Sequence, residues 1–580
     1  MRKIVSIVLS LLMISALFCF GASATDAVAI SSAADFAAMT PDGNYVLAAD
    51  ITIDATYEVA DGTGFTGTLD GAGHTVTTSV PMFALMNGTV KNLTVVGDIV
   101  SGDKYVGAVS MNTNAGNALF ENITNKANVT SSRPSTEDAC LGGILGKASK
   151  GSAAILRNCV NEGAITGPEA TGGICGESQI YGTLFENCLN KGKVTSLDNA
   201  SGAAAGGIIG YNGTDAVIVK NCTNNGEIVA GYRAGGIIGD ARKSAEVYNS
   251  VNNGNVTAKH EALKGNIAGG IIGYACDGST TTPLVIDGCI NNGKIDSYIE
   301  NSGTGDAAGI IGNAGSSKIN LNYTIKNCLN TGDVSGGYRV GGIAGYGYGT
   351  NDAYYVITNC VNIGKVSAGR FGSQFVAYTN SAGTTIKNCI GAGEMEALPV
   401  TDQITRLAIF SCSSASVEQC TVENAFIVDG GKTEWFSWAS YADGEANAKN
   451  RIPLETVLGK DLDGSAYKFN TYTDATYTTV ATADNEMVFT NTAETPVNVK
   501  AITRADAVSQ DLVDKANAAA GTTYVYLDGG KLTTIKPVVV DPTPVDPPIT
   551  GDYALVAVAA VAVVAVLGIA YVSKKKAITE

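Results

Sequence analysis

The stretch that decides the fold is Val219-Lys220-Asn221-Cys222-Thr223-Asn224-Asn225-Gly226-Glu227-Ile228, followed by Ala234-Gly235-Gly236-Ile237-Ile238-Gly239. Both halves recur through the middle of the chain. The Asn-Cys half returns from residues 158, 187, 327 and 359, and the glycine-rich half from residues 142, 172, 206, 269 and 341. Together with Cys222, the equivalent positions 159, 188, 250, 289, 328, 360 and 389 are spaced by 28 to 39 residues. A repeat of this period indicates stacked supersecondary units.

The pieces of the repeat predict short β-strands. Segments such as Tyr323-Thr324-Ile325-Lys326 and Glu227-Ile228-Val229 are rich in β-branched residues and are separated by glycine turns. We expect roughly three strands per repeat and a solenoid in which each coil buries its inner face against its neighbours. Eleven coil equivalents between Leu93 and Cys420 would form a rod on the order of 50 Å long, at about 4.8 Å per coil.

The repeat resembles the GLUG-type repeats of bacterial surface proteins, and the resemblance covers roughly residues 30 to 425. The segment from Gly64 to Val76 also resembles the opening coil of that family. The resemblance implies an all-β fold, a right-handed parallel β-helix. It specifies little about function, because such repeats occur in adhesins and in enzymes alike.

The first 24 residues have the features of a secretion signal. Arg2 and Lys3 form a basic start, residues 4–20 an apolar run, and Ala22-Ser23-Ala24 a small-residue cleavage site. The run is short for the alternative, a membrane helix. We therefore predict a secreted chain whose repeat β-helix, with its N-terminal cap, occupies residues 25–425.

Beyond the repeats, residues 426–535 form either a C-terminal cap or a small separate domain. This region contains an aromatic cluster that includes Trp435 and Trp438. Residues 505–520 predict a helix, which Gly521 would end. The proline-rich residues 536–546 predict an extended spacer.

Residues 547–580 resemble the sorting signals that sortases recognise on Gram-positive cell surfaces. The recognition peptide would be Pro547, Pro548, Ile549, Thr550 and Gly551, followed by an apolar span over 553–572 and Lys574-Lys575-Lys576. Pro547 stands where the family has leucine, which leaves the sortase class open. The resemblance implies a sortase as partner and anchoring to cell-wall peptidoglycan. The alternative is a plain C-terminal membrane anchor, which a transmembrane span of this length also fits.

The charge balance bears on partners. The formal net charge is −16, and removing the signal and everything after Thr550 leaves 33 basic and 52 acidic residues. An acidic surface argues against nucleic acid and against anionic membranes as partners. It is consistent with a soluble extracellular chain.

The cysteines and asparagines of the repeat predict internal ladders. Cysteines on successive coils would lie about 4.8 Å apart, whereas a disulfide needs Cβ atoms at about 3.8 Å. We therefore expect free, buried thiols from Cys159 to Cys389, with Cys420 as a further candidate, and no metal site among them. The repeated asparagines would bond to one another between coils; ligand binding along a polar stripe is the alternative reading.

The sequence holds no constellation typical of catalysis. His260-Glu261-Ala262-Leu263-Lys264 begins like a zinc-protease helix but has lysine where the second histidine is required. There is no Asp-Asp pair of the kind polysaccharide-cleaving β-helices use. We predict no catalytic residue, no metal and no cofactor.

Aromatic residues beside arginine are the candidates for glycan binding. Tyr232 and Arg233, and then Tyr338 and Arg339, recur at the same point of their coils, and Trp435 and Trp438 form the other candidate. Packed rings at solvated turns, or a small C-terminal core, are the alternatives. We expect an adhesin-like, wall-anchored, non-enzymatic surface protein whose ligand, a glycan or a host protein, is unknown. The alternative is a surface lyase or hydrolase acting on polysaccharides.

Overall fold

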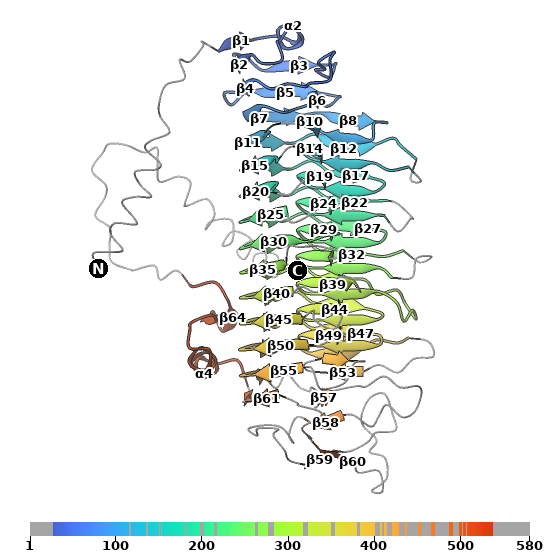
Figure 1. Cartoon of the computed structure of the whole chain (residues 1–580), viewed down its shortest axis with the longest axis vertical. Helices are drawn as coiled ribbons and strands as arrows, with labels where there is room; N and C mark the ends of the chain where they lie inside the picture. The colour runs from blue at the N-terminus through green and yellow to red at the C-terminus, as the bar shows by residue number, and fades with distance from the viewer. Residues whose placement is uncertain are drawn as a thin grey trace, which may run out of the picture. The chain divides into compact units, whose positions relative to one another are not determined.

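The computed structural model is a parallel β-solenoid of about 9 turns, with 52% of residues in strands and 4% in helices (Figure 1). It describes residues 27–400 apart from short loop gaps at 115, 117, 135–136, 150, 152, 180–181, 198–201, 214–216, 261–264, 276–282, 317–322, 350–353 and 380–382. Beyond residue 400 it describes short strands up to 505 and the stretch 507–537. The fold class predicted from the repeat is confirmed. Residues 1–24, 538–580 and 261–264 lie outside the described part, and with them the predicted signal, the sorting signal and most of the His260 motif.

One coil shows how the repeat folds. Its strands are β25 (Val217–Lys220), β26 (Thr223–Asn224), β27 (Ile228–Ala230), β28 (Arg233–Gly235) and β29 (Ile238–Ala241). Each pairs in parallel with the same segment of the next coil, so the described strands build four sheets along the rod. The coil has more strands than the expected three. A left-handed asparagine divides the first strand, and the Gly-Gly-Ile turn separates the last two.

In Figure 1 the strands of the first sheet follow the left edge of the solenoid, and those of the second sheet follow the right edge. The coil strands of the first sheet are β7 (Thr89–Val96), β11 (Leu119–Asn125), β15 (Ile155–Arg157), β16 (Val160–Asn161), β20 (Leu184–Glu186), β21 (Leu189–Asn190), β25, β26, β30 (Ala245–Tyr248), β31 (Val251–Asn252), β35 (Leu284–Asp287), β36 (Ile290–Asn291), β40 (Tyr323–Lys326), β41 (Leu329–Asn330), β45 (Tyr354–Thr358), β46 (Val361–Asn362), β50 (Gly383–Lys387), β51 (Ile390–Gly391), β55 (Cys420–Glu423) and β56 (Phe426–Val428). Those of the second sheet are β8 (Asp98–Ser101), β12 (Asn128–Ser131), β17 (Ile165–Gly167), β22 (Val194–Ser196), β27, β32 (Val256–Ala258), β37 (Ile295–Asp296), β42 (Val334–Gly336), β47 (Val366–Ala368) and β52 (Met395–Ala397).

The third and fourth sheets follow in each coil and meet at the Gly-Gly-Ile turn. The strands of the third sheet are β9 (Tyr105–Gly107), β13 (Cys140–Gly142), β18 (Ala170–Gly172), β23 (Ala204–Gly206), β28, β33 (Ile267–Gly269), β38 (Asp306–Ala308), β43 (Arg339–Gly341), β48 (Phe371–Ser373) and β53 (Arg406–Ala408). Those of the fourth are β6 (Phe83–Leu85), β10 (Ser110–Thr113), β14 (Leu145–Ala148), β19 (Cys175–Ser178), β24 (Ile209–Asn212), β29, β34 (Ile272–Ala275), β39 (Ile311–Ser316), β44 (Ala344–Gly349), β49 (Val376–Thr379) and β54 (Ser411–Ser413).

The N-terminal end of the solenoid is closed by β1 (Val28–Ile30), the short helix α2 (Ala33–Ala37), β2 (Asn44–Leu47), β3 (Ile51–Ile53), β4 (Thr68–Asp70) and β5 (Thr75–Thr78). The hydroxyl of Ser32 accepts a hydrogen bond from the backbone N–H of Asp35 and so caps α2. Phe36 of α2 packs 5.5 Å from the ring of Phe83 and 6.0 Å from that of Tyr57. The helix thereby covers the apolar end of the first coil.

The asparagine before each ladder cysteine bends the first sheet. Ten asparagines at this position have φ between 48° and 56°, namely residues 92, 122, 158, 187, 221, 249, 327, 359, 388 and 424, and Gly288 has φ 67°. Only glycine, and less often asparagine, adopts this left-handed conformation routinely. The repeat therefore keeps these two residue types where the strand must turn.

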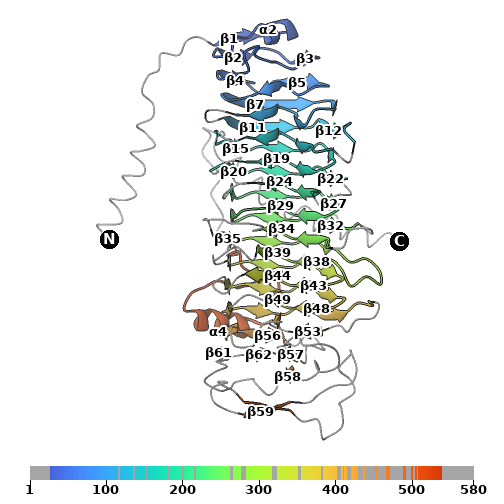
Figure 2. The same ribbon diagram turned by 45° about the vertical axis from the view of Figure 1, so that its right-hand side comes forward.

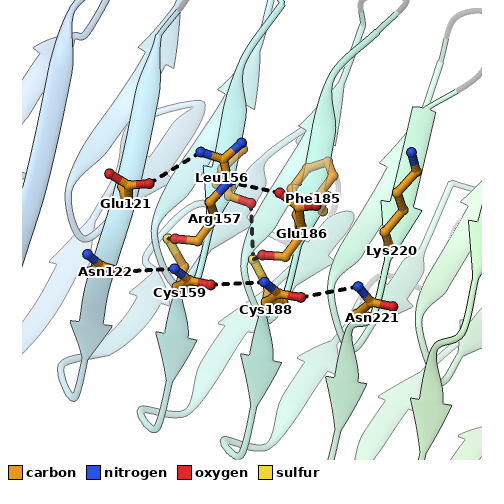
Figure 3. A network of polar contacts seen from close by, with 12 residues as sticks. Glu121, Asn122, Leu156, Arg157, Cys159, Phe185, Glu186, Cys188, Lys220 and Asn221 are labelled. Carbon is orange, nitrogen blue, oxygen red and sulfur yellow. Dashed lines mark hydrogen bonds and ion pairs between the residues drawn. The ribbon is translucent and has the colours of Figure 1, made fainter. Parts of the chain in front are cut away.

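The ladder cysteines fill the gap in backbone pairing that this bend creates (Figure 3). The thiol of Cys188 donates to the carbonyl of Leu156 on the preceding coil at 3.3 Å, and the Sγ of Cys222 accepts from the backbone N–H of Cys188 at 3.4 Å. Ser250 replaces cysteine in one coil and accepts from the N–H of Cys222 at 3.2 Å. In these coils the position holds a small side chain that can both donate and accept a hydrogen bond.

The predicted stacking of buried cysteines is confirmed for Cys159, Cys188, Cys222, Cys289, Cys328, Cys360 and Cys389, which are at most 1% exposed. The extension of the ladder to Cys420 is wrong. Cys420 pairs with Thr384, and the left-handed bend of this coil is at Asn424. Ala425, fully buried, therefore occupies the ladder position.

A second ladder of asparagines runs through the interior. Residues 125, 161, 190, 224, 252, 291, 330 and 362 are fully buried, and each amide nitrogen up to Asn330 donates to the next asparagine oxygen at 2.8 Å. The second glycine of each Gly-Gly turn lies against it: a Cβ added at Gly236 would lie 2.7 Å from that of Asn252. The structural reading of these asparagines is confirmed.

The C-terminal part rejoins the solenoid. Strands β61 (Asn498–Lys500) and β62 (Thr503–Ala505) add a further rung to the first sheet. Helix α4 (Gln510–Ala520) follows, capped by Ser509 and ended by Gly521 at φ 66°. The antiparallel hairpin of β63 (Tyr526–Asp528) and β64 (Lys531–Thr533) completes it. We call residues 510–533 the C-terminal strap.

The strap packs against the outer face of the first sheet (Figures 1 and 2). Leu512, Val513 and Ala516 of α4 belong to one buried cluster with an apolar stripe of the solenoid, formed by Ile290, Leu329, Val361, Ile390 and Phe426. The amide of Asn424 donates to the carbonyl of Ala519 at 3.1 Å. The strap is thus attached to the side of the rod. Among the described residues, no helix is long and apolar enough to span a membrane.

Candidate functional site

On the outer face of the first sheet, acidic and basic side chains alternate from coil to coil (Figure 3). The guanidinium of Arg157 lies 3.3 Å from the carboxylate of Glu121 and 2.8 Å from that of Glu186. The amide of Asn158 beside them donates to Asn122 at 2.9 Å. Exposed pairs of this kind contribute about 0–1 kcal/mol each. Their regular spacing favours the correct stacking register, since a shifted register would oppose like charges.

Where the third and fourth sheets meet, side chains on their outer sides contact each other. We call this junction the seam. It is lined by the first residue of each third-sheet strand and the third residue of each fourth-sheet strand. A glycine precedes the latter residue in most coils; a Cβ added at Gly239 would lie 2.6 Å from the carbonyl oxygen of Ala205. The absence of a side chain there allows the two sheets to approach closely.

Arg233 lies in the seam at β28. Its guanidinium bonds to the carboxylate of Asp240 on the same coil, and the two side chains are 8% and 1% exposed. The guanidinium also stacks over the rings of Tyr232, at 4.7 Å, and Tyr274, at 4.1 Å. Arg242 shares Asp240 at 3.4 Å. The arginine is thus fixed between two rings by a buried carboxylate.

Arg339 occupies the same position three coils beyond Arg233. Its environment is closely similar. Its Nε and one terminal nitrogen bond the two oxygens of Asp306 at 2.7 and 2.6 Å, a bidentate geometry. Its guanidinium lies 3.5 Å from the ring centre of Tyr346 and 4.5 Å from that of Tyr338. Burial opposes the charge, but Asp306 outweighs it and raises the pKa of Arg339.

The aromatic cluster around Arg339 extends to the next coil. Phe371 is 1% exposed, and its ring lies 5.7 Å from that of Tyr338 and 5.0 Å from that of Tyr378. The guanidinium of Arg370 lies 5.0 Å from the Tyr338 ring. The rings of Tyr346 and Tyr378 are 5.7 Å apart. Phe371 therefore forms the base of a group of half-buried tyrosines.

At its N-terminal end the seam holds an ion pair between a lysine and a glutamate instead. Lys147 bonds Glu177 at 3.0 Å, with both side chains under 10% exposed, and lies 4.7 Å from the ring centre of Tyr105. Burial alone would lower the pKa of Lys147, but the Glu177 carboxylate raises it. The thiol of Cys140 donates to Glu177 at 3.1 Å, and burial, followed by this carboxylate, raises its pKa. The group is an internal ion pair whose carboxylate also accepts a hydrogen bond from a protonated thiol.

The structure brings two of the three predicted glycan-binding pairs together in one feature. Tyr232 and Arg233, and Tyr338 and Arg339, lie at equivalent points of the seam. Of the remaining pair, Trp435 begins β57 (Trp435–Ser437), which pairs with β58 (Arg451–Pro453), and Trp438 lies outside the described residues. The peptide Pro547–Gly551 also lies outside them. The described residues include no group of three or more His, Cys, Asp or Glu that could hold a metal ion.

A row of tyrosines escaped the sequence analysis. Tyr211, Tyr274, Tyr346 and Tyr378 occupy the third position of their fourth-sheet strands, and the register aligns them along the rod with Asp240 and Asn313 between them. All four tyrosines are half-buried. The signal was present in the sequence: in three of the four cases the tyrosine directly follows the last glycine of a Gly-Gly-x-x-Gly motif.

No family model matches this chain, and no curated protein matches it. Among solved structures, it is similar to a crystal structure described as that of a putative immunoglobulin A1 protease from Bacteroides ovatus. The two share 18% identity, the match covers 49% of this chain and 84% of the other, and the TM-score is 0.34. At this TM-score the likeness supports no inference about the function of the chain.

Proposed function

We propose that this protein is a secreted, cell-wall-anchored surface protein of the GLUG-repeat type, which uses its β-solenoid as a rigid, adhesin-like binding face. The signal-like residues 1–24 support export, and the sorting-signal-like residues 547–580 support attachment to peptidoglycan by a sortase. The acidic composition is consistent with an extracellular chain.

One observation supports the binding function. The charged side chains of the seam are paired with one another, and tyrosine rings beside them are partly exposed to solvent. The guanidinium groups of Arg233 and Arg339 are occupied by Asp240 and Asp306, and Tyr232 and Tyr338 are held half-buried at the rim. Charges engaged in this way position the aromatic side chains. They do not form the pair of separated carboxyl groups that glycoside hydrolysis uses. Rigid, half-buried tyrosines are suited to stacking on a ligand.

The proposal is tested by a glycan array and a panel of host matrix proteins, run beside a product assay on the same polysaccharides. Purified residues 25–535 should bind at least one ligand and release no product. Tyr338→Ala should reduce that binding, whereas Tyr248→Ala, a tyrosine on the first sheet, should leave it unchanged. Turnover of a bound polysaccharide would instead identify a surface lyase or hydrolase, and failure to bind any ligand would refute the binding function.

A further inference from the structure

We propose that the C-terminal strap is a force-released, reversible extension of the link between the solenoid and its anchor. A pull on the chain beyond Lys536 peels the strap from the outer face of the first sheet while every coil stays folded. This inference rests on the anchoring part of the proposed function, because only an attached C-terminus transmits a pull.

The strap doubles back along the rod from the C-terminal end of the solenoid. The chain leaves the last rung at β62, and the amide of Asn424 in the coil before it donates to the carbonyl of Ala519 near the end of α4. In Figure 1, α4 lies at the level of β55, whereas β64 lies at the level of β45, two coils nearer the N-terminal end. Because Lys536 follows the hairpin in the chain, a pull on it loads the hairpin first and α4 last.

Apolar packing holds the strap to the solenoid. Leu512 and Val513 of α4 and Leu532 of the hairpin share one buried cluster with the apolar stripe. Among the described residues, the bond between Asn424 and Ala519 is the one hydrogen bond that joins the strap to a coil. The hairpin strands β63 and β64 pair only with each other. A pull from the hairpin end therefore separates these contacts a few at a time.

Each coil is held more firmly than the strap. Strands β25, β27, β28 and β29 all make parallel backbone pairings with the next coil, and the internal asparagine ladder adds a bond between Asn224 and Asn252. Segments with few hydrogen bonds to the rest of a protein open at a lower free-energy cost than its paired core. The strap should therefore leave the rod before any coil unfolds.

Two features favour the return of the strap when the pull ends. Asn517 of α4 donates to the carbonyl of Val525 at 2.8 Å and accepts from the N–H of Tyr524 at 3.0 Å, so one side chain joins the helix to the start of the hairpin segment. Contacts between residues this close in sequence form fast. The uncovered stripe, which includes Ile390 and Phe426, is apolar, and its removal from water favours rebinding of the strap.

The length of the strap sets the size of the extension. Its 24 residues, 510–533, reach about 84 Å when extended, at about 3.5 Å per residue. On the rod it spans three coil pairings, from β62 to β45, or about 14 Å at about 4.8 Å per pairing. Release therefore adds about 70 Å to the link, the difference between these two lengths.

Single-molecule force spectroscopy tests the inference on residues 25–550, the chain that export and sorting would leave, held at its two ends. We expect the first step to be about 70 Å and to reverse when the force is lowered. A coil of 28 to 39 residues would instead give a step of about 100–135 Å. The size of the first step thus distinguishes the strap from a coil.

A second attachment bypasses the strap. Ala507 is exposed and precedes α4, so an azide-bearing amino acid in its place can carry the handle. Held between residues 25 and 507, the chain should lose the strap step and keep the coil steps. This comparison needs no destabilising substitution, so it decides the matter even where a strap variant folds poorly.

Variants locate the contact that yields. Leu512→Asp should abolish the step, because a charge replaces a side chain of the buried cluster and the added length is then present from the lowest force. Lys515→Ala, on the exposed side of α4, is the matched control and should leave the step unchanged. Coil steps should be the same in both variants and in the wild type.

Three results would overturn the inference. They are a first step of coil length, a strap step that persists when the handle is at residue 507, and a strap step that Leu512→Asp leaves in place. Cell fractionation decides the anchoring separately. A strap step in a chain that is attached to neither wall nor membrane would refute the anchoring and leave this mechanical property standing, whereas an attached chain without the step would refute this inference alone.

Discussion

The amide nitrogen of Asn362 donates to the side-chain oxygen of Gln374 at 2.6 Å, and this bond ends the internal asparagine ladder. In the next coil the ladder position is Gly391, which pairs with Asn362. Gln374 stands where earlier coils have the second glycine of the Gly-Gly turn, and its own amide donates to the carbonyl of Gly393. One long amide thus fills the space of a missing asparagine and satisfies its hydrogen bonds.

This relationship predicts a coupled pair of substitutions. Gln374→Gly removes one of the two acceptors of the buried Asn362 amide and should destabilise the last coils by about 1–3 kcal/mol. Gly391→Asn alone should also destabilise, because an added Cβ would lie 3.2 Å from that of Gln374. The double variant restores the repeat and should be more stable than either single one. Thermal unfolding of the four proteins measures the coupling; additive effects would contradict it.

The left-handed bend predicts a different pattern at Gly288, whose φ is 67°. Gly288→Asn should be tolerated, because asparagine occupies this position in the other coils. Gly288→Ala should cost about 1–2 kcal/mol, the price of a left-handed conformation for an ordinary residue. The comparison is made by melting temperature and by hydrogen exchange of the coils on either side. Equal stability of the two variants would show that conformation is not the cause.

The ladder thiols predict a dependence on pH. Burial raises the pKa of Cys159, Cys222, Cys289, Cys328 and Cys360 well above the ordinary value. The folded chain therefore keeps protons that the unfolded chain loses above about pH 8.5. Stability should be unaffected by these groups below that pH and should fall as the pH rises beyond it.

The same thiols should react with alkylating reagents only after denaturation, since the thiolate is the nucleophile. Cys222→Ser, which copies Ser250, should change stability little. Cys222→Ala should cost about 1–2 kcal/mol, because the N–H of Cys188 loses its acceptor. Mass spectrometry after timed alkylation gives the reactivity; rapid labelling of Cys222 in the folded chain would be incompatible with this account.

The strap should detach when its apolar face is disrupted. Leu512 is 2% exposed and lies in the cluster with Phe426 and Ile390. Leu512→Asp should uncover the stripe, increase binding of an apolar dye and make residues 507–537 sensitive to protease, while circular dichroism of the solenoid persists. Lys515→Ala, on the exposed side of α4, is the control. Unchanged protease resistance would show that other contacts hold the strap.

The anchoring proposal predicts the effect of Thr550→Ala. A sortase cysteine would attack the carbonyl of Thr550, release the segment from Gly551 onward and pass the acyl group to a cell-wall amine. The wild type should resist detergent and be released by wall-digesting enzymes, whereas the variant should stay in the membrane fraction. Extraction of the wild type by detergent alone, with Glu580 still attached, would identify a simple membrane anchor.

The sequence by itself determined the solenoid. The Asn-Cys-x-Asn and Gly-Gly-x-x-Gly motifs are local, and each states a physical requirement of one coil: a left-handed bend at Asn221, a small polar side chain at Cys222, an internal amide at Asn224, and space for it at Gly207. Requirements of this kind recur in every coil and involve residues close together in the sequence. They can therefore be recognised from the sequence alone.

Only the tertiary structure decided which residues of different coils meet. Loops of unequal length separate the coils, so sequence spacing does not show that Ala425 rather than Cys420 continues the ladder. The contact of Leu512 with the stripe that includes Ile290 joins segments more than 200 residues apart. Such contacts depend on the register and on the direction of each side chain, which packing fixes only when the coils are stacked.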